Sequence, residues 1–358
     1  MSHGEGTGIA FFYHPDFAGY DFGANHPFRG DRFDSFIRSL EERFPDVFGR
    51  LDLRTPERAS DELLLLAHTR SYLERVDSLE KRRGFLSLDT QVLPGSVEAA
   101  RLVVGASVAG ARAALADSLA AGFGGLHHAG PNYGEGFCIF NDVAVAAATV
   151  LEDGLERVLI LDTDAHQGNG TMDIFYEDSR VLFISLHQDP RTLYPGRGFV
   201  YEIGAGKGKG FTANIPMPML AGWPLYEMAM DEIVDPLIQG FKPQLIIRNG
   251  GGDPLYTDIL TNLGLDLDSL TRLNRRIAGR AKELNVPLLD IFLSGYGPYV
   301  TEGWLAIIRG LLDEPMELSI PEKMKRISGR EQAMMHESMR RTLDELMLLL
   351  KPFWNVFQ

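Results

Sequence analysis

The residues best suited to chemistry follow a short apolar run in the middle of the chain. Residues 158–161 read Val-Leu-Ile-Leu, and Asp162, Asp164 and His166 come after them. Ligands of open α/β sheets bind at the carboxyl ends of strands. If the chain is still extended there, Asp164 and His166 point to the same side and could hold one metal ion together. A helix-capping aspartate beside an unrelated histidine is the less favoured interpretation.

Two adjacent histidines form the second candidate group. His127 and His128 could be metal ligands or a pair that transfers protons, although neighbouring histidines lie more often on a surface. Glycine-rich and apolar segments surround them, and the string Gly-Phe-Cys-Ile-Phe-Asn follows at residues 136–141. This setting favours a partly buried loop.

The elements that must position these groups alternate between strand and helix. Apolar segments without polar alternation are typical of parallel strands covered on both faces. Such segments lie at residues 8–13, 158–162, 181–186, 243–247 and 287–293. Helical patterns lie at residues 96–121, 141–151, 224–238 and 267–284, with one or two closing helices from Pro321. The alternation predicts a parallel α/β sheet, and no repeat or low-complexity linker interrupts it, so one domain over residues 1–358 is expected.

Composition limits the classes of function. The chain has 358 residues, and its single cysteine, Cys138, allows no internal disulfide and fits a reducing compartment. The formal net charge of −14 argues against a nucleic-acid binder, which needs a basic face. The charge suits a cationic substrate, or it only keeps the protein soluble. No signal peptide or membrane-spanning run is found, so a cytoplasmic location and no membrane partner are expected.

The order and spacing of several motifs resemble the histone deacetylase and acetoin-utilisation deacetylase family of amidohydrolases. The matching strings are His-His-Ala at 127–129, Gly-Phe-Cys-Ile-Phe-Asn at 136–141 and Asp-Thr-Asp-Ala-His-Gln-Gly-Asn-Gly-Thr at 162–171. His-Pro-Phe at 26–28 and Asn-Ile-Pro at 214–216 extend the resemblance over most of the chain. It implies a single-domain arginase/deacetylase-like α/β fold, with a mostly parallel central sheet of about eight strands flanked by helices on both faces.

The resemblance implies a zinc-dependent deacetylase that hydrolyses the acyl amide of an amine. One Zn²⁺ ion, or Fe²⁺, would activate water in a site that keeps an open coordination position. His128 would act as general base and then as general acid, and His127 would assist it. Asp162 is implied as the partner of His127 and Asn169 as the partner of His128, which makes His128 less basic than a carboxylate partner would.

The resemblance also implies the metal ligands. Asp164 and His166 are two of them, and a third aspartate comes from a later segment. The string Gly-Asp-Pro-Leu offers Asp253, but an ungapped match to the family pattern Gly-x-Asp-x-x-x-x-Asp-Pro-Leu favours Asp258, with Ile259 where proline is usual. We therefore expect Asp258 as the third ligand, with Asp253 as a structural carboxylate near the site and as the alternative ligand.

The catalytic tyrosine is implied by the family's Gly-Gly-Tyr string after a late strand. Tyr296 matches it best, Ser294 departs from the usual glycine, and Tyr299 is the less favoured choice. Tyr296 would donate a hydrogen bond to the oxyanion of the tetrahedral intermediate, a contribution of about 3 kcal/mol.

Further sites follow only from the resemblance. The residues implied for a structural K⁺ ion are Asp162, Asp164, His166, Ser185 and Leu186. Those implied for substrate binding are Asp89, Gly136, Phe137, Tyr194 and Leu265. Of these, Phe137 and Tyr194 would wall an acyl tunnel and Asp89 would hold the substrate backbone. Leu265 is expected at the rim, where its apolar side chain speaks against acetylpolyamines.

Other interpretations remain. An arginase-type enzyme with two Mn²⁺ ions would need acidic ligands where Gln167, Gly168 and Asn169 stand. A module that binds acyl-amines without turnover is a second alternative. The intact set of His128, Asp164, His166, Asp258 and a tyrosine argues against it. The glycine-rich residues 204–210 do not open a helix, which disfavours a phosphate loop. Acetyl-lysine in proteins, acetylpolyamines and other small acyl-amines all stay open as substrates.

Overall fold

One parallel sheet of eight strands organises the computed structural model, which describes residues 8–321 and 327–358. In spatial order the strands are β2 (Leu51–Arg54), β1 (Ile9–Phe12), β5 (Leu119–Phe123), β10 (Leu288–Ser294), β9 (Leu245–Gly251), β6 (Val158–Asp162), β7 (Val181–Gln188) and β8 (Thr212–Met217). Every neighbouring pair is parallel. The predicted fold class is therefore confirmed.

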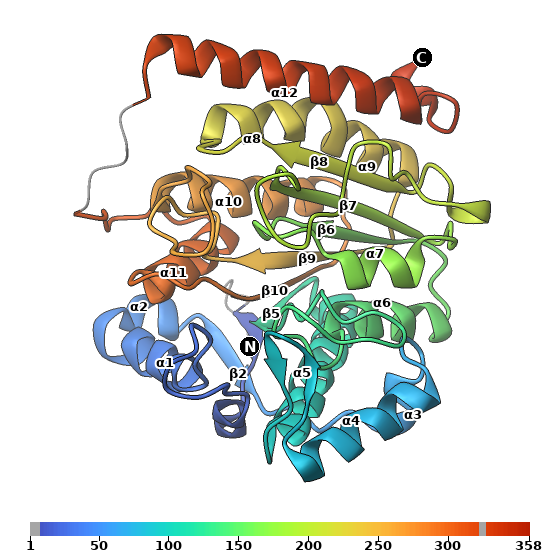
Figure 1. Cartoon of the computed structure of the whole chain (residues 1–358). Coiled ribbons are helices and arrows are strands. Elements are labelled where there is room, and N and C mark those ends of the chain that lie inside the picture. Colours follow the sequence, from blue (N-terminus) through green and yellow to red (C-terminus); the bar gives the residue numbers. More distant parts are fainter. Residues whose placement is uncertain (1–7, 322–326) are drawn as a thin grey trace, which may run out of the picture.

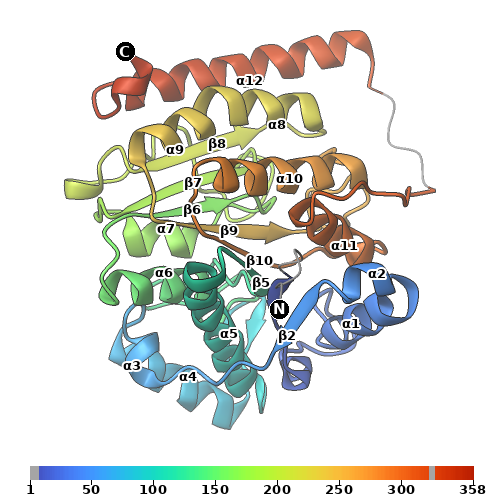
Figure 2. The same ribbon diagram turned by 180° about the vertical axis from the view of Figure 1, so that it is seen from behind.

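Helices cover both faces of this sheet. Figure 1 shows α7 on the near face, and the view from behind in Figure 2 shows α10 on the opposite face. The helices are α1 (Asp31–Arg43), α2 (Pro45–Phe48), α3 (Asp61–Leu64), α4 (Arg70–Arg82), α5 (Ser96–Asp117), α6 (Asp142–Glu152), α7 (Asn169–Phe175), α8 (Trp223–Ala229), α9 (Asp235–Phe241), α10 (Leu267–Glu283), α11 (Val300–Leu311) and α12 (Gly329–Leu350). A short hairpin of β3 (Phe85–Ser87) and β4 (Thr90–Gln91) completes the fold.

The expected helix over residues 96–121 is wrong at its end. Helix α5 stops at Asp117 because Ser118 adopts a left-handed conformation with φ of 71°. The next residues, Leu119–Phe123, form β5, which pairs with β1 and β10 in the centre of the sheet. Alanine-rich sequence favours helix, and here pairing on both edges of β5 overrides that local preference.

Helix α5 is also the one helix in the described ranges that is long and apolar enough to span a bilayer. Its most apolar window is 72% buried inside the protein, where the helix packs on β5, β1 and β10. Length and apolarity are therefore accounted for by its place in the core.

The remaining predicted elements differ only in extent. Strands found near residues 8–13, 158–162, 181–186, 243–247 and 287–293 match the prediction, whereas β2 and β8 had not been counted as strands. A π-helical turn, Met230–Val234, interrupts the helix expected over residues 224–238. Of the closing helices, α12 is present, and residues 322–326 lie outside the described residues.

A charged pair is buried inside the sheet itself. Arg248 on β9 and Asp290 on β10 are neighbours in register, and both side chains are fully buried. Their closest N–O distance is 3.1 Å, and Arg248 also donates from Nε to Thr163 Oγ1 at 2.9 Å. Burial raises the pKa of Asp290 to about 6, against the opposing effect of Arg248, so the carboxyl is mostly ionised at pH 7.5.

Removing one member of this pair leaves a buried charge without its partner. We expect Asp290→Ala to lower the free energy of unfolding at pH 7.5 by about 3–5 kcal/mol, measured by urea denaturation. Asp117→Ala is the matched control, because it breaks an exposed pair with Arg54 and should cost less than about 1 kcal/mol. Equal losses in the two variants would contradict this account of the buried pair.

Candidate active site

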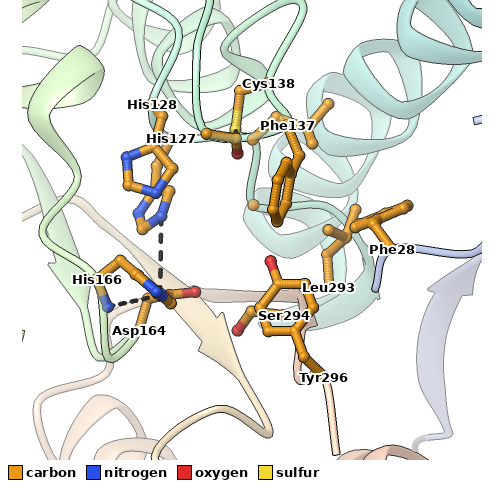
Figure 3. A pocket seen from close by; sticks show the side chains of 13 residues that line it. Phe28, His127, His128, Phe137, Cys138, Asp164, His166, Leu293, Ser294 and Tyr296 are labelled. Atoms are coloured by element: carbon orange, nitrogen blue, oxygen red, sulfur yellow. Dashed lines mark hydrogen bonds and ion pairs between the residues drawn. The ribbon is translucent and has the colours of Figure 1, made fainter. Parts of the chain in front are cut away.

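A pocket lies where the segments after β5, β6 and β10 meet (Figure 3). It holds about 280 Å³ of space that no atom fills, part of it open to solvent. Figure 3 shows the two histidines of residues 127–128 and the Asp164–His166 pair on one side, with Phe137 and Tyr296 across from them. The lining residues are Phe28, Gly125, Leu126, His127, His128, Gly136, Phe137, Cys138, Asp164, His166, Leu293, Ser294 and Tyr296.

Three buried side chains, two of which line the pocket, could hold a metal ion. Ligand atoms of Asp164, His166 and Asp253 all lie within 4.8 Å of one another. His166 Nδ1 is 3.1 Å from Asp164 Oδ1 and 3.0 Å from Asp253 Oδ2. Three protein ligands would leave one coordination position of a zinc ion open, as in catalytic rather than structural zinc sites. Among residues 8–321 and 327–358 this is the only such group.

Asp253, the alternative third ligand, lies in this cluster, whereas Asp258, the expected ligand, is outside it, and its role as a ligand stays a prediction. Both carboxylate oxygens of Asp258 accept backbone hydrogen bonds. Oδ1 accepts from the N–H groups of Leu260 and Thr261 at 2.8 and 3.2 Å, and Oδ2 accepts from that of Tyr296 at 2.7 Å. Asp253 follows β9 by two residues and stays at the sheet edge, whereas Asp258 lies beyond a turn.

Asp253 is held in place from two sides. Ser294 Oγ donates to its Oδ1 at 2.6 Å, and the Ala165 N–H donates to its Oδ2 at 3.1 Å. Burial, and then the neighbouring Asp164 carboxylate, raise the pKa of Asp253 well above its usual range. Two buried carboxylates this close need positive charge between them, which fits a cation site.

The two histidines have the partners that the sequence suggested. His127 donates from Nδ1 to Asp162 Oδ2 at 2.7 Å, and His128 Nδ1 lies 2.7 Å from Asn169 Oδ1. All four side chains are buried. The centroids of the two imidazole rings are 4.2 Å apart and the ring planes are tilted by 55°, so both rings lie at the same end of the pocket.

Their surroundings drive the two pKa values apart. Burial, His127 and His166 lower the pKa of His128 well below its usual value, so His128 is neutral at pH 7. Burial also acts to lower the pKa of His127, but Asp162 and Asp164 outweigh it and raise that pKa to about 9. A neutral imidazole beside a protonated one is an arrangement suited to acid–base catalysis.

Tyr296 faces this group from the loop that follows β10. Its ring lies 5.7 Å from that of Phe137 and 6.4 Å from that of His166. Burial, followed by the Asp164 and Asp253 carboxylates, raises the pKa of Tyr296 well above 10, so its hydroxyl keeps the proton and can donate. Tyr299 instead caps α11 and does not line the pocket.

Four of the expected substrate-binding residues lie in the pocket wall or against it: Gly136 and Phe137 line the pocket, and Tyr194 and Asp89 contact residues that do. Phe137 has a left-handed φ of 66°, which turns its ring toward Tyr296. Tyr194 is 39% exposed, and its ring lies 5.1 Å from that of His128. Asp89 Oδ1 accepts the N–H of Gly136 at 3.2 Å, which links the β3–β4 hairpin to the pocket wall.

The expected position of Leu265 is wrong. Its side chain is fully buried, and its backbone forms a bridge with Leu255, so it cannot stand at an open rim. Leu265 therefore gives no information for or against acetylpolyamines as substrates. The two residues that follow Asp258 are more accessible: Ile259 is 64% exposed and Leu260 is half-buried.

The residues expected to hold K⁺ lie at and just after the end of β6 and in the adjacent part of β7. Asp162 and Ser185 are paired in register across the two strands. Asp162 Oδ1 accepts the Asp164 N–H at 3.1 Å, and Ser185 Oγ lies 2.8 Å from His187 Nδ1. Potassium binding by Asp162, Asp164, His166, Ser185 and Leu186 stays a prediction.

Two supporting residues were missed in the sequence. Asn249 donates from Nδ2 to Asp162 Oδ1 at 3.1 Å, so it fixes the carboxylate that holds His127. Ser294, treated only as a departure from glycine, orients Asp253. A signal for the first was present, because an asparagine inside a buried apolar strand needs a hydrogen-bond partner.

Comparison with known proteins finds relatives over nearly the whole chain. The family model described as the histone deacetylase domain matches residues 26–311. A probable deacetylase of Archaeoglobus fulgidus is 34% identical over 366 residues, covering 98% of this chain and 99% of that protein. A histone deacetylase-like amidohydrolase of Pseudomonas aeruginosa is 39% identical over 279 residues, covering 74% of this chain and 73% of its own length. The crystal structure of the HDA15 HD domain has a TM-score of 0.83 and 26% identity, covering 98% of this chain and 96% of its own.

The third ligand can be identified by the same substitution at two aspartates. We expect Asp253→Asn to weaken zinc binding by more than about 100-fold, because losing a ligand costs more than losing a residue that only orients one. Asp258→Asn should weaken it by less than about tenfold, since that side chain acts through backbone hydrogen bonds. Competition with a chromogenic chelator measures both affinities, and the reverse order would show that the ligand is Asp258.

Proposed function

This chain belongs to the histone deacetylase family, and from that premise we propose that it is a metal-dependent deacylase acting on acylated amines. Family membership supports deacetylase or amidohydrolase activity. The observation that carries the metal-dependent form is the buried group of Asp164, His166 and Asp253 beside the paired histidines. Amide hydrolysis needs a nucleophile, a proton carrier and a donor to the oxyanion, and the pocket offers residues for each.

A divalent ion, Zn²⁺ or Fe²⁺, fits the donor set of Asp164, His166 and Asp253. Such an ion, when bound, supplies a Lewis acid that activates water and polarises an amide carbonyl. The second metal of an arginase-type site is disfavoured, because the Gln167 and Asn169 side chains are neutral and are engaged by Asn214 and His128.

The chain's own groups would move the protons. His128, kept neutral by burial and by the neighbouring His127, accepts a proton from the attacking water and then returns it to the leaving amine. His127, paired with Asp162, carries a positive charge that stabilises the negative charge developing beside it. Tyr296 donates its hydroxyl proton in a hydrogen bond to the oxyanion.

The substrate class follows from the pocket and the charge of the protein. Phe137 and Tyr194 provide aromatic walls for an acyl chain, and the amine side of the substrate extends to the mouth beside Asp89. The net charge of −14 favours a substrate that carries positive charge elsewhere, because the acylated nitrogen itself is neutral. Acetyl-lysine in a protein and small acetylated amines both fit this class. The proposal includes a cytoplasmic location and a structural K⁺ ion. Acetylpolyamines stay among the substrates to be tested.

Replacing the proposed base tests this mechanism. His128→Ala should lower kcat at least about 100-fold on a fluorogenic acetyl-lysine substrate, because it removes the proton carrier. Bound metal, measured by elemental analysis, should be unchanged, since His128 is outside the ligand group. A chelator should abolish the wild-type activity and added Zn²⁺ should restore it.

Two results would count against the mechanism. Full activity in His128→Ala would refute its role as base. A wild-type protein that binds acylated amines from a wide panel but releases no acid would be a binding module instead.

Replacing tyrosine by phenylalanine at two positions tests the oxyanion donor. Tyr296→Phe should lower kcat by about 100- to 1,000-fold with little change in KM, because the lost hydrogen bond forms chiefly in the transition state. Tyr299→Phe is the matched control and should change kcat by less than about threefold, since Tyr299 does not line the pocket. If the loss appears in Tyr299→Phe, the donor has been assigned to the wrong tyrosine.

A further inference from the structure

A carboxylate lies behind the pair formed by His128 and Asn169. Asn169 donates from Nδ2 to Glu135 Oε1 at 2.7 Å, while its Oδ1 lies 2.7 Å from His128 Nδ1. Nδ2 also donates to the hydroxyl oxygen of Tyr133 at 3.3 Å. The amide therefore has an acceptor on its nitrogen side and an imidazole on its oxygen side.

These contacts determine which way round the amide stands. A carboxylate only accepts hydrogen bonds, so the NH₂ group of Asn169 must face Glu135. The amide oxygen is then left for His128, and because that oxygen also only accepts, His128 Nδ1 must carry the hydrogen. His128 Nε2 consequently keeps its lone pair, which is the state that a general base needs.

Tyr133 reinforces this orientation through a short chain of hydrogen bonds. Its hydroxyl donates to Asp173 Oδ2 at 2.7 Å, and Arg197 donates to the same oxygen at 2.9 Å. With its hydrogen directed to Asp173, the tyrosine oxygen is free to accept from Asn169. Both neighbours on the nitrogen side of the amide are thus acceptors.

An asparagine in this position is ambiguous without such neighbours. The two ends of an amide have nearly the same shape, so a half-turn of Asn169 would direct NH₂ toward His128. His128 would then carry its hydrogen on Nε2 and could not accept a proton there. An aspartate has no such ambiguity, because either of its oxygens accepts from Nδ1.

We propose that Glu135 is a positioning residue that, together with Tyr133, fixes the Asn169 amide and so holds His128 in the tautomer protonated on Nδ1. The kinetic part of this inference rests on the proposed role of His128 as base, whereas the tautomer itself does not. Glu135 acts through Asn169, since its carboxylate bonds the amide nitrogen and not the imidazole.

The tautomer can be measured directly in the zinc-loaded protein. Long-range ¹H–¹⁵N spectra of histidine-labelled protein distinguish the two tautomers, and the His128→Ala spectrum identifies the signals of His128. We expect wild type and Glu135→Gln to show hydrogen on Nδ1, because glutamine retains a carbonyl acceptor for Asn169. Glu135→Met, similar in length but without an acceptor, should show a mixture with the Nε2-protonated form. An unchanged tautomer in Glu135→Met would overturn the proposal.

Kinetics supply a second test that a merely structural role would not pass. Glu135→Met should lower kcat by about 10- to 100-fold with KM within about threefold, as is typical when an orienting partner is lost. Adding Asn169→Asp to Glu135→Met should recover most of that loss, because a carboxylate needs no orienting neighbour. Failure of Asn169→Asp to raise kcat in that background would overturn the proposal.

One further contact of Glu135 needs a control. Burial, and next the Glu135 carboxylate, raise the pKa of Tyr194, so Glu135→Met also disturbs that tyrosine. Tyr194→Phe removes only the hydroxyl and should leave the His128 tautomer as in wild type; a shifted tautomer there would assign the effect to Tyr194. Activity in His128→Ala would refute the proposed function, yet the tautomer spectra would still decide the role of Glu135.

Discussion

The close approach of two buried carboxylates is the constraint on which the rest of the site depends. Asp164 and Asp253 share the imidazole of His166, and like charges this close in a dry interior repel strongly unless a cation lies between them. Neighbouring groups stabilise both carboxylates. Ser294 and the backbone N–H of Ala165 donate hydrogen bonds to Asp253, and His127 lies beside Asp164. A proton on one carboxylate relieves this repulsion, as the raised pKa of Asp253 indicates, and positive charge between the two carboxylates would do the same.

Much of this arrangement could be predicted from the sequence. The apolar run ending at Asp162 predicted a central strand with ligands at its carboxyl end, and β6 has that extent. The pairs His127–Asp162 and His128–Asn169 followed from resemblance and appear in the structure at 2.7 Å each. These features depend on residues that are close together in the sequence or that recur at fixed spacing, and such patterns can be recognised from the sequence alone.

What could not be predicted depends on contacts between distant segments. Asp253 and Asp258 are five positions apart with the same side chain, and only the turn between them decides which one reaches Asp164. Leu265 was placed at a rim that tertiary packing closes over, and residues 119–121 of β5 were predicted as helix because their partner strands are far away in sequence. Hydrogen-bond satisfaction, as for Asn249, is the signal that sequence reasoning had available and did not use.

The hydrogen bonds of Asp258 couple two loops of the site. Its carboxylate spans two loops, since one oxygen caps the turn that follows the Asp253 segment and the other holds the backbone N–H of Tyr296. Tyr296 and the segment that follows Asp253 are thereby tied to a common anchor. A shift in one loop carries the other with it, which keeps the position of Tyr296 relative to Asp253 nearly constant.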